Sequence, residues 1–486
     1  MEHAPTGTET PVLIVGGSIV GLSLSLFLGQ CGVRALTVER HAGTALHPRA
    51  RVFYPRTLEL FRASGVAARV QALGAVPEAT DESWSPARFV YLGQDRLEPI
   101  VLQAARQTGA DIRFGCELVA WRSEPGGVVA ELNERASGQR IPVRASYLVA
   151  ADGVRSSIRD QLSISQSGRG SLGHNLAILF EADLAEVQLP GFTRITHPEA
   201  AGVIVATDVQ DRYIYSIDYD PARDLLESFT AERWTARLRV ALGLPRLEPR
   251  IAGVFPWEVA ERVADRFSVG RVFLAGDAAH QMPPMGGFGA NTGIHDAGNL
   301  AWKLASVLRG EAGAGLLDSY HSERHPVAVA TAEHATVTAL RMSEAGREAT
   351  RGIDLPDEAC IMRAYRYGGS PTIPLRLSEA DEHGAPGSRV PHLWLDVEHT
   401  RSTIDLCGRR LVVISPDEGW RDAAAQSSAA LDFAHVPGIA AALELGSRGA
   451  VLVRPDAVVA ARWQHMPGDA PRALADAVRT LLRPRS

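Results

Sequence analysis

The residues with the most evident chemistry lie in one stretch, residues 270–303. It opens with a short apolar run that predicts a buried strand, breaks at Gly276-Asp277, and continues through a loop rich in proline and glycine. From about Thr292 its apolar residues recur at helical spacing. A carboxylate after a buried strand can accept hydrogen bonds from a ligand, and glycines let backbone N–H groups approach that ligand closely. We interpret the stretch as the cradle of a flavin.

A glycine-rich turn near the start of the chain has the pattern of a dinucleotide site. A strand, a turn, a helix and a second strand are expected at residues 12–15, 16–21, 22–30 and 35–38. In such a unit the helix N-terminus binds the pyrophosphate, and a carboxylate after the second strand, here Glu39, binds the adenosine ribose. Ser18 stands where the pattern has its middle glycine, and its hydroxyl could donate to a phosphate oxygen. Because Glu39 would repel a 2′-phosphate, NADP is not expected at this turn. The alternative is a turn without a ligand.

Two other segments could serve the same site. Residues 147–151 predict a strand that runs into Asp152-Gly153 and a helix start, as the first stretch does at Asp277. Taken alone, this segment is better explained as an ordinary helix cap. Arg49 and Arg51 precede a predicted helix beside the phosphate-binding turn. Arginines beside such a turn could contact a cofactor. Alternatively, they are solvated charges in an arginine-rich chain.

The middle of the chain changes to alternating polarity, which predicts an antiparallel sheet. The expected strands are residues 175–184, 202–208 and 212–219. Tyr213, Tyr215 and Tyr219 alternate and therefore share one face of this sheet. A row of aromatic side chains usually packs in a core, but it could also form the wall of a pocket for a flat ligand.

Composition narrows the class of protein. A chain of 486 residues should divide into roughly two or three domains. The net charge of −6 and the lack of a basic block argue against a nucleic acid as partner. The widely spaced cysteines form no C-x-x-C pair, so neither a zinc site nor a redox dithiol is predicted. The start does not resemble a signal peptide, and no uncharged stretch reaches the roughly 18 residues of a membrane helix. We therefore expect a cytoplasmic protein that does not enter a membrane.

Three segments together resemble a known family. They are VGGSIVGL at 15–22 with Glu39-Arg40 behind it, AADGVRSSIR at 150–159, and GRVFLAGDAAHQMPPMGGFGANTGIHDAGNLAWKL at 270–304. They resemble the FAD-dependent aromatic hydroxylases, which are single-component (class A) flavoprotein monooxygenases, and most of all the aromatic polyketide hydroxylases. The last part, with PGSRVPHLWL, STIDL and VLVRPD, is similar to the thioredoxin-like appendage that those enzymes carry without active cysteines.

The resemblance covers about the whole chain and implies an α/β fold. It has a Rossmann-like FAD-binding domain, an interleaved antiparallel-sheet substrate domain and a C-terminal thioredoxin-like domain. The implied parts are 1–174 and 262–345 for the FAD-binding domain, 66–93 and 175–261 for the substrate-binding sheet, 346–387 for an extended connector and 388–486 for the thioredoxin-like domain. From its own pattern the last part is a small α/β unit that serves packing or dimerisation.

The resemblance also implies which residues hold the cofactor. The ADP half of FAD would lie against Gly16, Ser18, Gly21 and Glu39, with Arg40 beside them. Arg49 and Gln94 would contact the diphosphate and ribityl side, Asp277 the ribityl hydroxyls, and Asp152 a segment also implicated in NAD(P)H use. Pro284 and the backbone of Gly287, Gly289, Ala290 and Asn291 would lie along the isoalloxazine ring. No metal site is implied.

The implied reaction is hydroxylation of a phenolic aromatic polyketide with O₂, through a flavin C4a-hydroperoxide, after reduction by NADPH or NADH. No second glycine-rich dinucleotide unit is present, so the nicotinamide would bind transiently in the flavin groove. Tyr215 and Arg366 are the candidate catalytic residues, since the phenol must be activated. Two alternatives remain open: Baeyer–Villiger insertion or oxidative rearrangement on a polyketide, and a catalytically silent flavin- or ligand-binding protein. A monomer or homodimer is expected.

Overall fold

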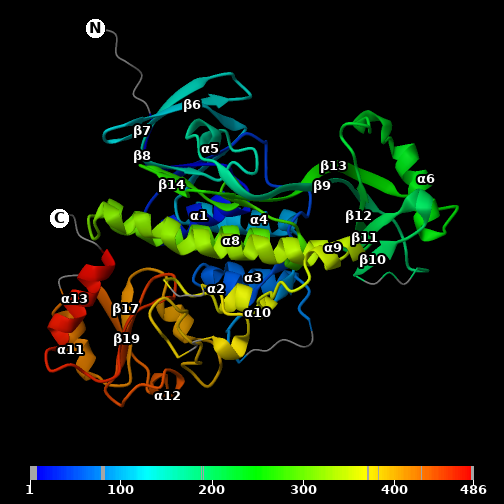
Figure 1. Cartoon of the computed structure of the whole chain (residues 1–486). Coiled ribbons are helices and arrows are strands. Elements are labelled where there is room, and N and C mark those ends of the chain that lie inside the picture. Colours follow the sequence, from blue (N-terminus) through cyan, green and yellow to red (C-terminus); the bar gives the residue numbers. More distant parts are fainter. Residues whose placement is uncertain are drawn as a thin grey trace, which may run out of the picture.

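Both glycine-rich segments belong to one eight-stranded sheet (Figure 1). In this computed structural model its continuous path runs β14-β15-β8-β1-β2-β5, and the β6–β7 hairpin joins it at β8. The strands from β15 to β5 are parallel. The bounds are Thr8–Val15 (β1), Ala35–Glu39 (β2), Asp111–Phe114 (β5), Cys116–Glu124 (β6), Gly127–Glu134 (β7), Arg140–Ala150 (β8), Ser268–Val269 (β14) and Val272–Leu274 (β15). The structure describes residues 8–77, 83–187, 189, 191–368, 372–380, 383–427 and 430–482.

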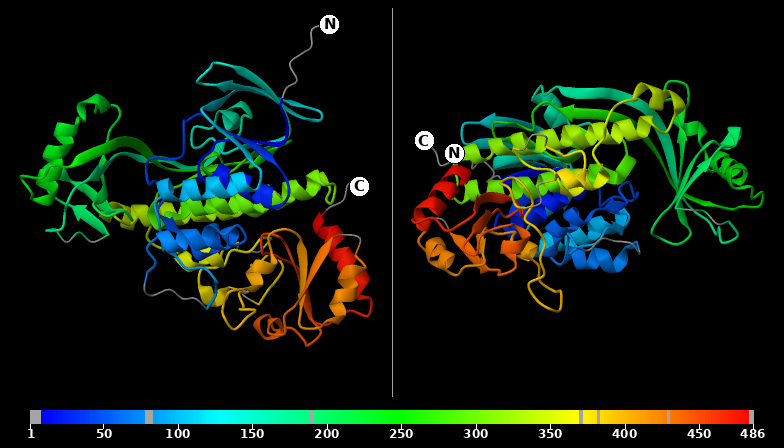
Figure 2. Two further views of the ribbon diagram at one scale, coloured as in Figure 1. Left: turned by 180° about the vertical axis from the view of Figure 1, so that it is seen from behind. Right: turned by 60° about the horizontal axis from the view of Figure 1, so that its bottom comes forward.

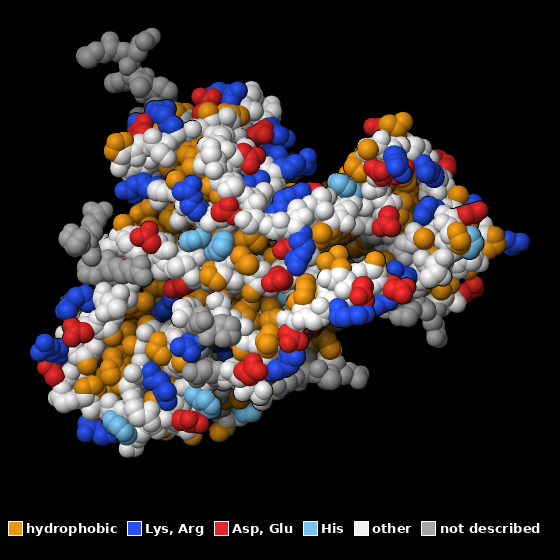
Figure 3. All heavy atoms as spheres, in the orientation of Figure 1, with side chains coloured by type: hydrophobic (Ala, Val, Ile, Leu, Met, Phe, Trp, Pro, Cys, Tyr) orange, Lys and Arg blue, Asp and Glu red, His pale blue; other side chains and the backbone are white. Residues whose placement is uncertain are grey.

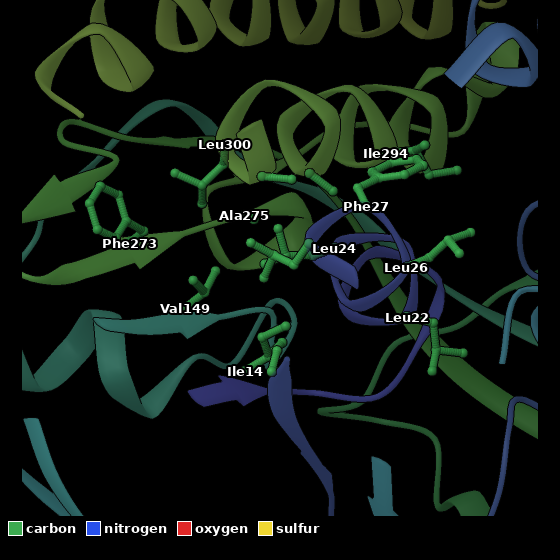
Figure 4. Close-up of a cluster of buried hydrophobic side chains, with 14 of the residues drawn as sticks. Ile14, Leu22, Leu24, Leu26, Phe27, Val149, Phe273, Ala275, Ile294 and Leu300 are labelled. Carbon is green, nitrogen blue, oxygen red and sulfur yellow. The ribbon is translucent and has the colours of Figure 1, made fainter. Parts of the chain in front are cut away.

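Helix α1 (Ile19–Gln30) lies at the centre of the main core. It is apolar almost all round, which is the composition of a fully buried helix. It packs between the sheet and the helices α4 (Gln94–Gln107) and α7 (Phe288–Leu308). Figure 4 shows side chains of the sheet, α1 and α7 meeting there: Ile14, Leu22, Leu24, Leu26, Phe27, Val149, Phe273, Ala275, Ile294 and Leu300. This packing fixes the N-termini of α1 and α7 relative to the sheet.

Two helices differ from the sequence-based expectation. Helix α7 begins at Phe288 and not at about Thr292, because Gly287 adopts a left-handed conformation, with φ of 67°, and lets the chain turn directly into the helix. Helix α8 (Asp318–Leu340) continues through Pro326, although a proline within a helical pattern predicts a new helix or a kink. An internal proline costs a helix about 3 kcal/mol. Burial of the neighbouring Val327 and Ala328 against the body offsets part of that cost.

The interleaved domain is a six-stranded sheet that projects from the body (Figures 1 and 2). Its order is β10-β11-β12-β9-β13-β16, and all pairs are antiparallel, as the alternating pattern predicts. The bounds are Gln166–Glu181 (β9), Phe192–Ile195 (β10), Gly202–Ala206 (β11), Arg212–Asp218 (β12), Arg250–Ala264 (β13) and His280–Gln281 (β16). Helix α6 (Ala231–Leu242) covers one face. Since β16 follows the Asp277 turn directly, this sheet is joined to the first domain beside that turn.

The interval 66–93 does not belong to this sheet, and its expected assignment to the substrate domain was wrong. Helix α3 (Val66–Leu73) packs against α2 (Pro55–Arg62) and α4. Strand β4 (Val90–Tyr91) pairs with β3 (Val52–Phe53). The buried side chains of this interval join the main core because they face α2 and α4. Residues 78–82 lie outside the described part of the chain.

The C-terminal domain has a four-stranded sheet of order β18-β17-β19-β20 flanked by helices, a thioredoxin-like arrangement (Figure 1). The bounds are Leu411–Ser415 (β17), Leu431–His435 (β18), Ala450–Val453 (β19), Val459–Trp463 (β20), Gly419–Ala425 (α11), Ile439–Ala442 (α12) and Ala470–Leu482 (α13). All four cysteines are free, so this domain carries no disulfide.

The connector is packed, although an extended segment was expected. Its helices α9 (Glu344–Ala349) and α10 (Glu358–Arg363) follow α8. Cys360, Ile361, Tyr365 and Tyr367 are buried in a cluster with Phe288, the first residue of α7. The connector therefore covers the glycine loop. Residues 369–371 and 381–382 of this segment lie outside the described ranges.

The surface mixes both signs of charge on the face shown in Figure 3, where a notch separates the lobe of the β6–β7 hairpin from the lobe of α6. In the sequence, the short helix α5 (Ser157–Gln161) follows β8 of the first sheet and precedes β9 of the second. None of the helices among the described residues is both long and apolar enough to span a membrane.

Candidate active site

The first glycine turn has no room for a side chain at Gly16 or Gly21, and it leads into the uncapped N-terminus of α1. Gly16 has φ of 110°, and a Cβ there would lie 2.1 Å from the carbonyl oxygen of Ala151. A Cβ at Gly21 would lie 1.9 Å from the carbonyl oxygen of Gly16. Ser18 is the N-cap of α1, yet its side chain caps no amide, and the first turn contains no acidic residue. The helix N-terminus therefore offers backbone donors and the positive end of its dipole to a pyrophosphate.

Glu39 ends β2 beside this turn. Its carboxylate accepts hydrogen bonds from the backbone N–H of Gly17, at 2.8 Å, and of His41, at 2.9 Å. The side chain is 12% exposed, so it is held in place and still accessible from the groove. Arg40, the next residue, is exposed. This geometry suits a carboxylate that binds ribose hydroxyls.

The hydroxyl of Ser18 is used inside the protein, which corrects the expectation that it donates to a phosphate. It donates to Glu98, which is 1% exposed, at 2.6 Å. Gln94 donates to the same carboxylate at 2.7 Å, and the backbone N–H of Ala45 donates to its other oxygen at 2.6 Å. Sequence reasoning found Gln94 but missed Glu98. The signal was there, since the spacing of four residues places both on one face of α4.

Asp277 lies in a short turn, Gly276–Ala278, directly after β15. Its side chain is exposed, and its carboxylate has no hydrogen-bond partner among the described residues. Desolvation by the surrounding protein nevertheless raises its pKa, against the charges of His280 and Arg49, which lower it. A carboxylate that solvent can reach although protein surrounds it lies on the wall of a recess. Such a group is available to the hydroxyls of a bound molecule.

The glycine loop offers backbone amides at the N-terminus of α7. Gly286 and Gly287 both have positive φ, of 78° and 67°. No side chain caps α7, and its first turn has no acidic residue. Gly289 and Ala290 lie half-buried in that turn, and Pro284 precedes it. The loop can therefore stabilise negative charge on a ring placed against it.

Asn291 holds the loop in place. Its Oδ1 accepts from the backbone N–H of Tyr54 at 3.1 Å and from the hydroxyl of Thr57 at 2.6 Å. Its Nδ2 donates to the carbonyl oxygens of Val52, at 2.9 Å, and Gly287, at 2.8 Å. The side chain is thereby saturated, so only its backbone is left for a ligand. Tyr54, which sequence reasoning missed, also donates its hydroxyl to the carbonyl oxygen of Gly286 at 2.7 Å.

Asp152 follows β8, and its Oδ1 is buried without a hydrogen-bond partner in the described part of the chain. Desolvation raises its pKa, while a hydrogen bond from Ser156 opposes the rise. Ser156 caps α5 by accepting from the backbone N–H of Arg159 at 3.1 Å. The helix cap that the sequence favoured is therefore present, and its capping residue is Ser156. The Oδ1 atom of Asp152 remains without a hydrogen-bond donor in the described part of the chain.

These groups form a row because four adjacent strands end together. Leu274 of β15 is paired with Ala150 of β8, Ala150 with Val15 of β1, and Val15 with Val38 of β2. In this strand order the groups that follow the strand ends are Asp277, Asp152, Gly16 and Glu39. Four neighbouring strands span about 14 Å. The row thus suits an elongated ligand at the carboxyl edge of a parallel sheet, with a polyol contact at one end and a ribose contact at the other.

Tyr215 lies away from this row, which corrects its assignment as a catalytic residue. It is fully buried on the face that α6 covers, edge-on to Trp234 with ring centroids 5.9 Å apart. Its hydroxyl donates to the carbonyl oxygen of Ala200 and accepts from Arg237 at 3.2 Å. The alternation placed the tyrosines on one face correctly but could not say which face meets the ligand. The geometry favours the packing interpretation.

The opposite face of the sheet approaches the first domain. Phe255 of β13 lies on it, in a small apolar cluster with Ile214 and Leu179. The imidazole of His47 packs edge-on against Phe255, with ring centroids 4.2 Å apart. His47 is 9% exposed, and both its ring nitrogens lack a hydrogen-bond partner within the described ranges. Neither His47 nor Phe255 was expected from the sequence, because neither belongs to a motif.

Arg366 is half-buried in the connector. Its backbone N–H donates to the carbonyl oxygen of Thr372 at 2.8 Å, and its Nε donates to that of Pro386 at 3.2 Å. The buried Tyr365 and Tyr367 stand on either side of it in sequence. A catalytic role for Arg366 stays a prediction.

Known proteins share this arrangement. A family model described as FAD binding domain matches residues 9–335, and one described as aromatic-ring hydroxylase, C-terminal, matches residues 383–484. A putative polyketide hydroxylase of Streptomyces halstedii is 41% identical, over 94% of this chain and 94% of that protein. A 4-methyl-5-nitrocatechol 5-monooxygenase of Burkholderia sp is 38% identical, over 99% of each chain. A crystal structure of aklavinone-11 hydroxylase with FAD and aklavinone has a TM-score of 0.87 and 33% identity, over 98% of this chain and 99% of that chain.

The fold, the row of groups at the sheet edge and these matches agree with one another. The FAD-binding model covers more than half of the chain, and the similar proteins are matched over nearly their whole length. This chain therefore belongs to the FAD-dependent aromatic-ring hydroxylases, flavoprotein monooxygenases with FAD as their cofactor.

Proposed function

We propose that this enzyme hydroxylates an aromatic, polyketide-type phenol and consumes O₂ and NADPH or NADH. The row of Asp277, Asp152, Gly16 and Glu39 carries the proposal, because it fits an extended FAD whose ring end reaches the six-stranded sheet. The names of two similar proteins, a polyketide hydroxylase and an aklavinone hydroxylase, support the substrate class.

Each residue of the row would bind a different part of FAD. Gly16, Gly21 and the N-terminus of α1 would hold the diphosphate, and Glu39 the adenosine ribose. Asp277 would accept from the ribityl hydroxyls, since its carboxylate is exposed and has no partner among the described residues. Gln94 and Ser18 would support the diphosphate side indirectly, through Glu98.

The protein contributes position, charge and protection from water. Bound flavin supplies the hydride acceptor and the centre that activates O₂. The amides and the dipole at the N-terminus of α7 stabilise negative charge on its ring. Phe288, Tyr365 and Tyr367 of the connector cluster cover the glycine loop and keep water from that side.

The substrate would lie against the sheet face of Phe255 and Ile214, a flat apolar wall suited to fused rings. Burial, with the charges of Arg49 and Arg51, lowers the pKa of His47 to about 4, so its imidazole is neutral near pH 7. A neutral imidazole can accept a hydrogen bond from a phenol. The same arginine charges favour the phenolate form of a substrate nearby. Arg366 is our proposed second contact for that oxygen.

The nicotinamide would enter the same groove, with Asp152 beside it, because the sequence has no second dinucleotide turn. Every residue of the row comes from one chain. The proposed FAD contacts are compatible with the expected monomer or homodimer.

The decisive experiment follows ¹⁸O into product. Purified enzyme, FAD and NADPH are incubated under ¹⁸O₂ with tetracyclic and angucyclic phenols, and in a parallel arm with single-ring nitrocatechols. One ¹⁸O in a new hydroxyl of an intact polycyclic skeleton supports the proposal. A lactone or ring-expanded product would instead show Baeyer–Villiger insertion or rearrangement, and turnover of single-ring compounds alone would refute the polyketide assignment. Flavin-loaded protein whose NADPH oxidation no substrate stimulates would be a silent binding protein.

A further inference from the structure

One buried carboxylate, Asp296 of α7, joins both ends of the Asp277 turn. Its Oδ2 accepts from the backbone N–H of Gly276, immediately before Asp277, at 3.1 Å. The same oxygen pairs with Nε2 of His280, three residues after Asp277, at 2.7 Å. Asp296 and His280 are both fully buried. A single oxygen atom thus fixes the start and the end of the segment that presents Asp277.

Asp296 is itself held by Arg324 of α8. The Nε of Arg324 donates to the other carboxylate oxygen, Oδ1, at 2.8 Å, and its Nη2 donates to the carbonyl oxygen of Thr292 at 3.2 Å. Both side chains of this ion pair are fully buried. Burial alone would raise the pKa of Asp296, but the charges of His280 and Arg324 hold it below its usual value. The carboxylate therefore stays ionised and keeps accepting at both oxygens.

Two further hydrogen bonds support the turn: the backbone N–H of Ala279 donates to the carbonyl oxygen of Gly276 at 2.8 Å, and Nη1 of Arg159 donates to that of Ala278 at 3.3 Å. Asp296 differs from these contacts in that it reaches both Gly276 and His280. Gly276 has φ of 60°, and a Cβ there would lie 2.8 Å from a methyl group of Val20, so the backbone is already packed closely against α1. The second ring nitrogen of His280, Nδ1, is buried without a partner in the described part of the chain. The contact with Asp296 is thus the hydrogen bond that orients the imidazole ring of His280.

Arg324 also reaches the connector. Its Nη1 donates to the hydroxyl of Tyr367 at 3.3 Å, and its guanidinium lies over the ring of Tyr365, 5.6 Å from the centroid. These tyrosines are the sequence neighbours of Arg366. One guanidinium therefore connects the Asp277 turn with the segment that carries the proposed substrate contact.

We propose that Asp296 and Arg324 are positioning residues for the cofactor: together they set the orientation in which Asp277 meets the ribityl chain of FAD. The proposal rests on the placement of FAD against Asp277 given above. Neither residue touches the cofactor. Their effect is transmitted through the backbone of Gly276 and the ring of His280.

The test measures FAD binding and not only turnover. Asp296→Asn keeps the size of the side chain but loses the charge and one acceptor. We expect its FAD dissociation constant to rise about tenfold or more, the loss typical of a hydrogen bond to a charged group. The visible absorption bands of the remaining bound flavin should shift. His280→Gln, which retains a donor near the position of Nε2, should bind FAD better than His280→Leu.

A matched control separates positioning from general stability. Lys303 of α7 and Glu323 of α8 form another ion pair between the same helices, with Nζ and Oε2 2.8 Å apart and the Glu323 side chain 13% exposed. Glu323 also pairs with Arg454 at 2.7 Å, and neither Lys303 nor Glu323 forms a hydrogen bond with the Asp277 turn in the described part of the chain. Glu323→Gln should lower the melting temperature of the apoprotein while the folded enzyme binds FAD as the wild type does. If Glu323→Gln and Asp296→Asn weaken FAD binding equally, Asp296 is only a structural residue and the inference fails.

The placement of FAD against Asp277 and the positioning role of Asp296 are tested by different variants. If Asp277→Ala weakens FAD binding and Asp296→Asn does not, the cofactor placement stands and the positioning role is refuted. If Asp277→Ala leaves the FAD dissociation constant unchanged, the placement itself is refuted, and the positioning role is refuted with it.

Discussion

The hydroxyl of Ser18 donates to the buried carboxylate of Glu98, 2.6 Å away, and so links the first glycine turn to helix α4. Ser18 stands where the dinucleotide pattern has a glycine, and its side chain makes a contact within the protein. The same carboxylate is approached by Gln94 and by the backbone of Ala45. The position of the phosphate-binding turn therefore depends on a helix that has no place in the dinucleotide motif.

Ser18→Ala and Glu98→Gln should act on the same contact. Each should lower the free energy of unfolding of the apoprotein by about 1–2 kcal/mol, and the double variant should lose less than their sum. Denaturant titration of the four proteins measures this coupling. We expect the FAD affinity of Ser18→Ala to change less than about threefold, which is under 1 kcal/mol. A much weaker affinity with unchanged stability would mean that the hydroxyl contacts the phosphate after all.

Asp277→Ala should weaken FAD retention about tenfold, since the variant lacks the acceptor for the ribityl hydroxyls. Flavin content after gel filtration, followed by titration of the apoprotein, measures the loss. Asp277→Asn is the control, because it keeps an oxygen acceptor and should retain more flavin than the alanine variant. Equal flavin content in all three proteins would refute the ribityl contact.

Tyr215→Phe should leave flavin content and hydroxylation unchanged and lower the free energy of unfolding by about 1–2 kcal/mol, because the carbonyl of Ala200 loses its donor. Phe255→Ala, on the other face of the sheet, should instead raise KM for an aromatic substrate and keep the flavin. Steady-state kinetics and thermal unfolding distinguish the two. Slow hydroxylation by a Tyr215→Phe enzyme of normal stability would return this tyrosine to the catalytic residues.

His47 should make the fold sensitive to acid. Its pKa is lowered from 6.5 to about 4 in the folded chain, mainly by burial and then by the charge of Arg49. The unfolded chain therefore takes up the proton first as the pH falls. The stabilising contribution is complete above pH 6.5 and is lost as the pH falls to about 4, by roughly 3 kcal/mol in all.

His47→Gln should flatten this part of the stability curve, and unfolding free energies measured from pH 7 to pH 4 test it. His41→Gln is the control, since it removes a histidine whose side chain is 67% exposed. If the unfolding free energy of His47→Gln depends on pH as that of the wild type does, another group dominates between pH 7 and pH 4. His392 is one such group, because burial lowers its pKa to about 4 as well.

Much of the fold follows from local pattern. The strands expected at residues 35–38 and 212–219 agree to within one residue with β2 and β12, because each is a single run with a clear start and end. The order of segments at the cofactor edge also follows from the sequence, since each glycine or aspartate comes directly after an apolar strand. The start of α7 was missed because it depends on the left-handed conformation of Gly287, which a helical pattern does not encode.

The contacts made between distant segments could not be predicted. Glu98 and Asp296 lie on helices whose polar residues look like ordinary surface positions until the partners, Ser18 and Arg324, are placed beside them. The alternation in β12 shows that its tyrosines share a face, but the choice of face depends on where α6 packs. The proposed wall of the substrate site and the residues proposed to orient the turn could for that reason be found only in the structure.

The strand order determines when the cofactor edge can be completed during synthesis on the ribosome. β1, at the start of the chain, lies between β2 and β8, but β15, which completes the cofactor edge, is synthesised only after strands β9 to β13 of the six-stranded sheet. Such long-range pairing is slow to form and leaves the nascent sheet edge open. The cofactor edge is therefore completed late in synthesis, and until then Leu148, Val149 and Ala150 at the end of β8 lack their partners in β15.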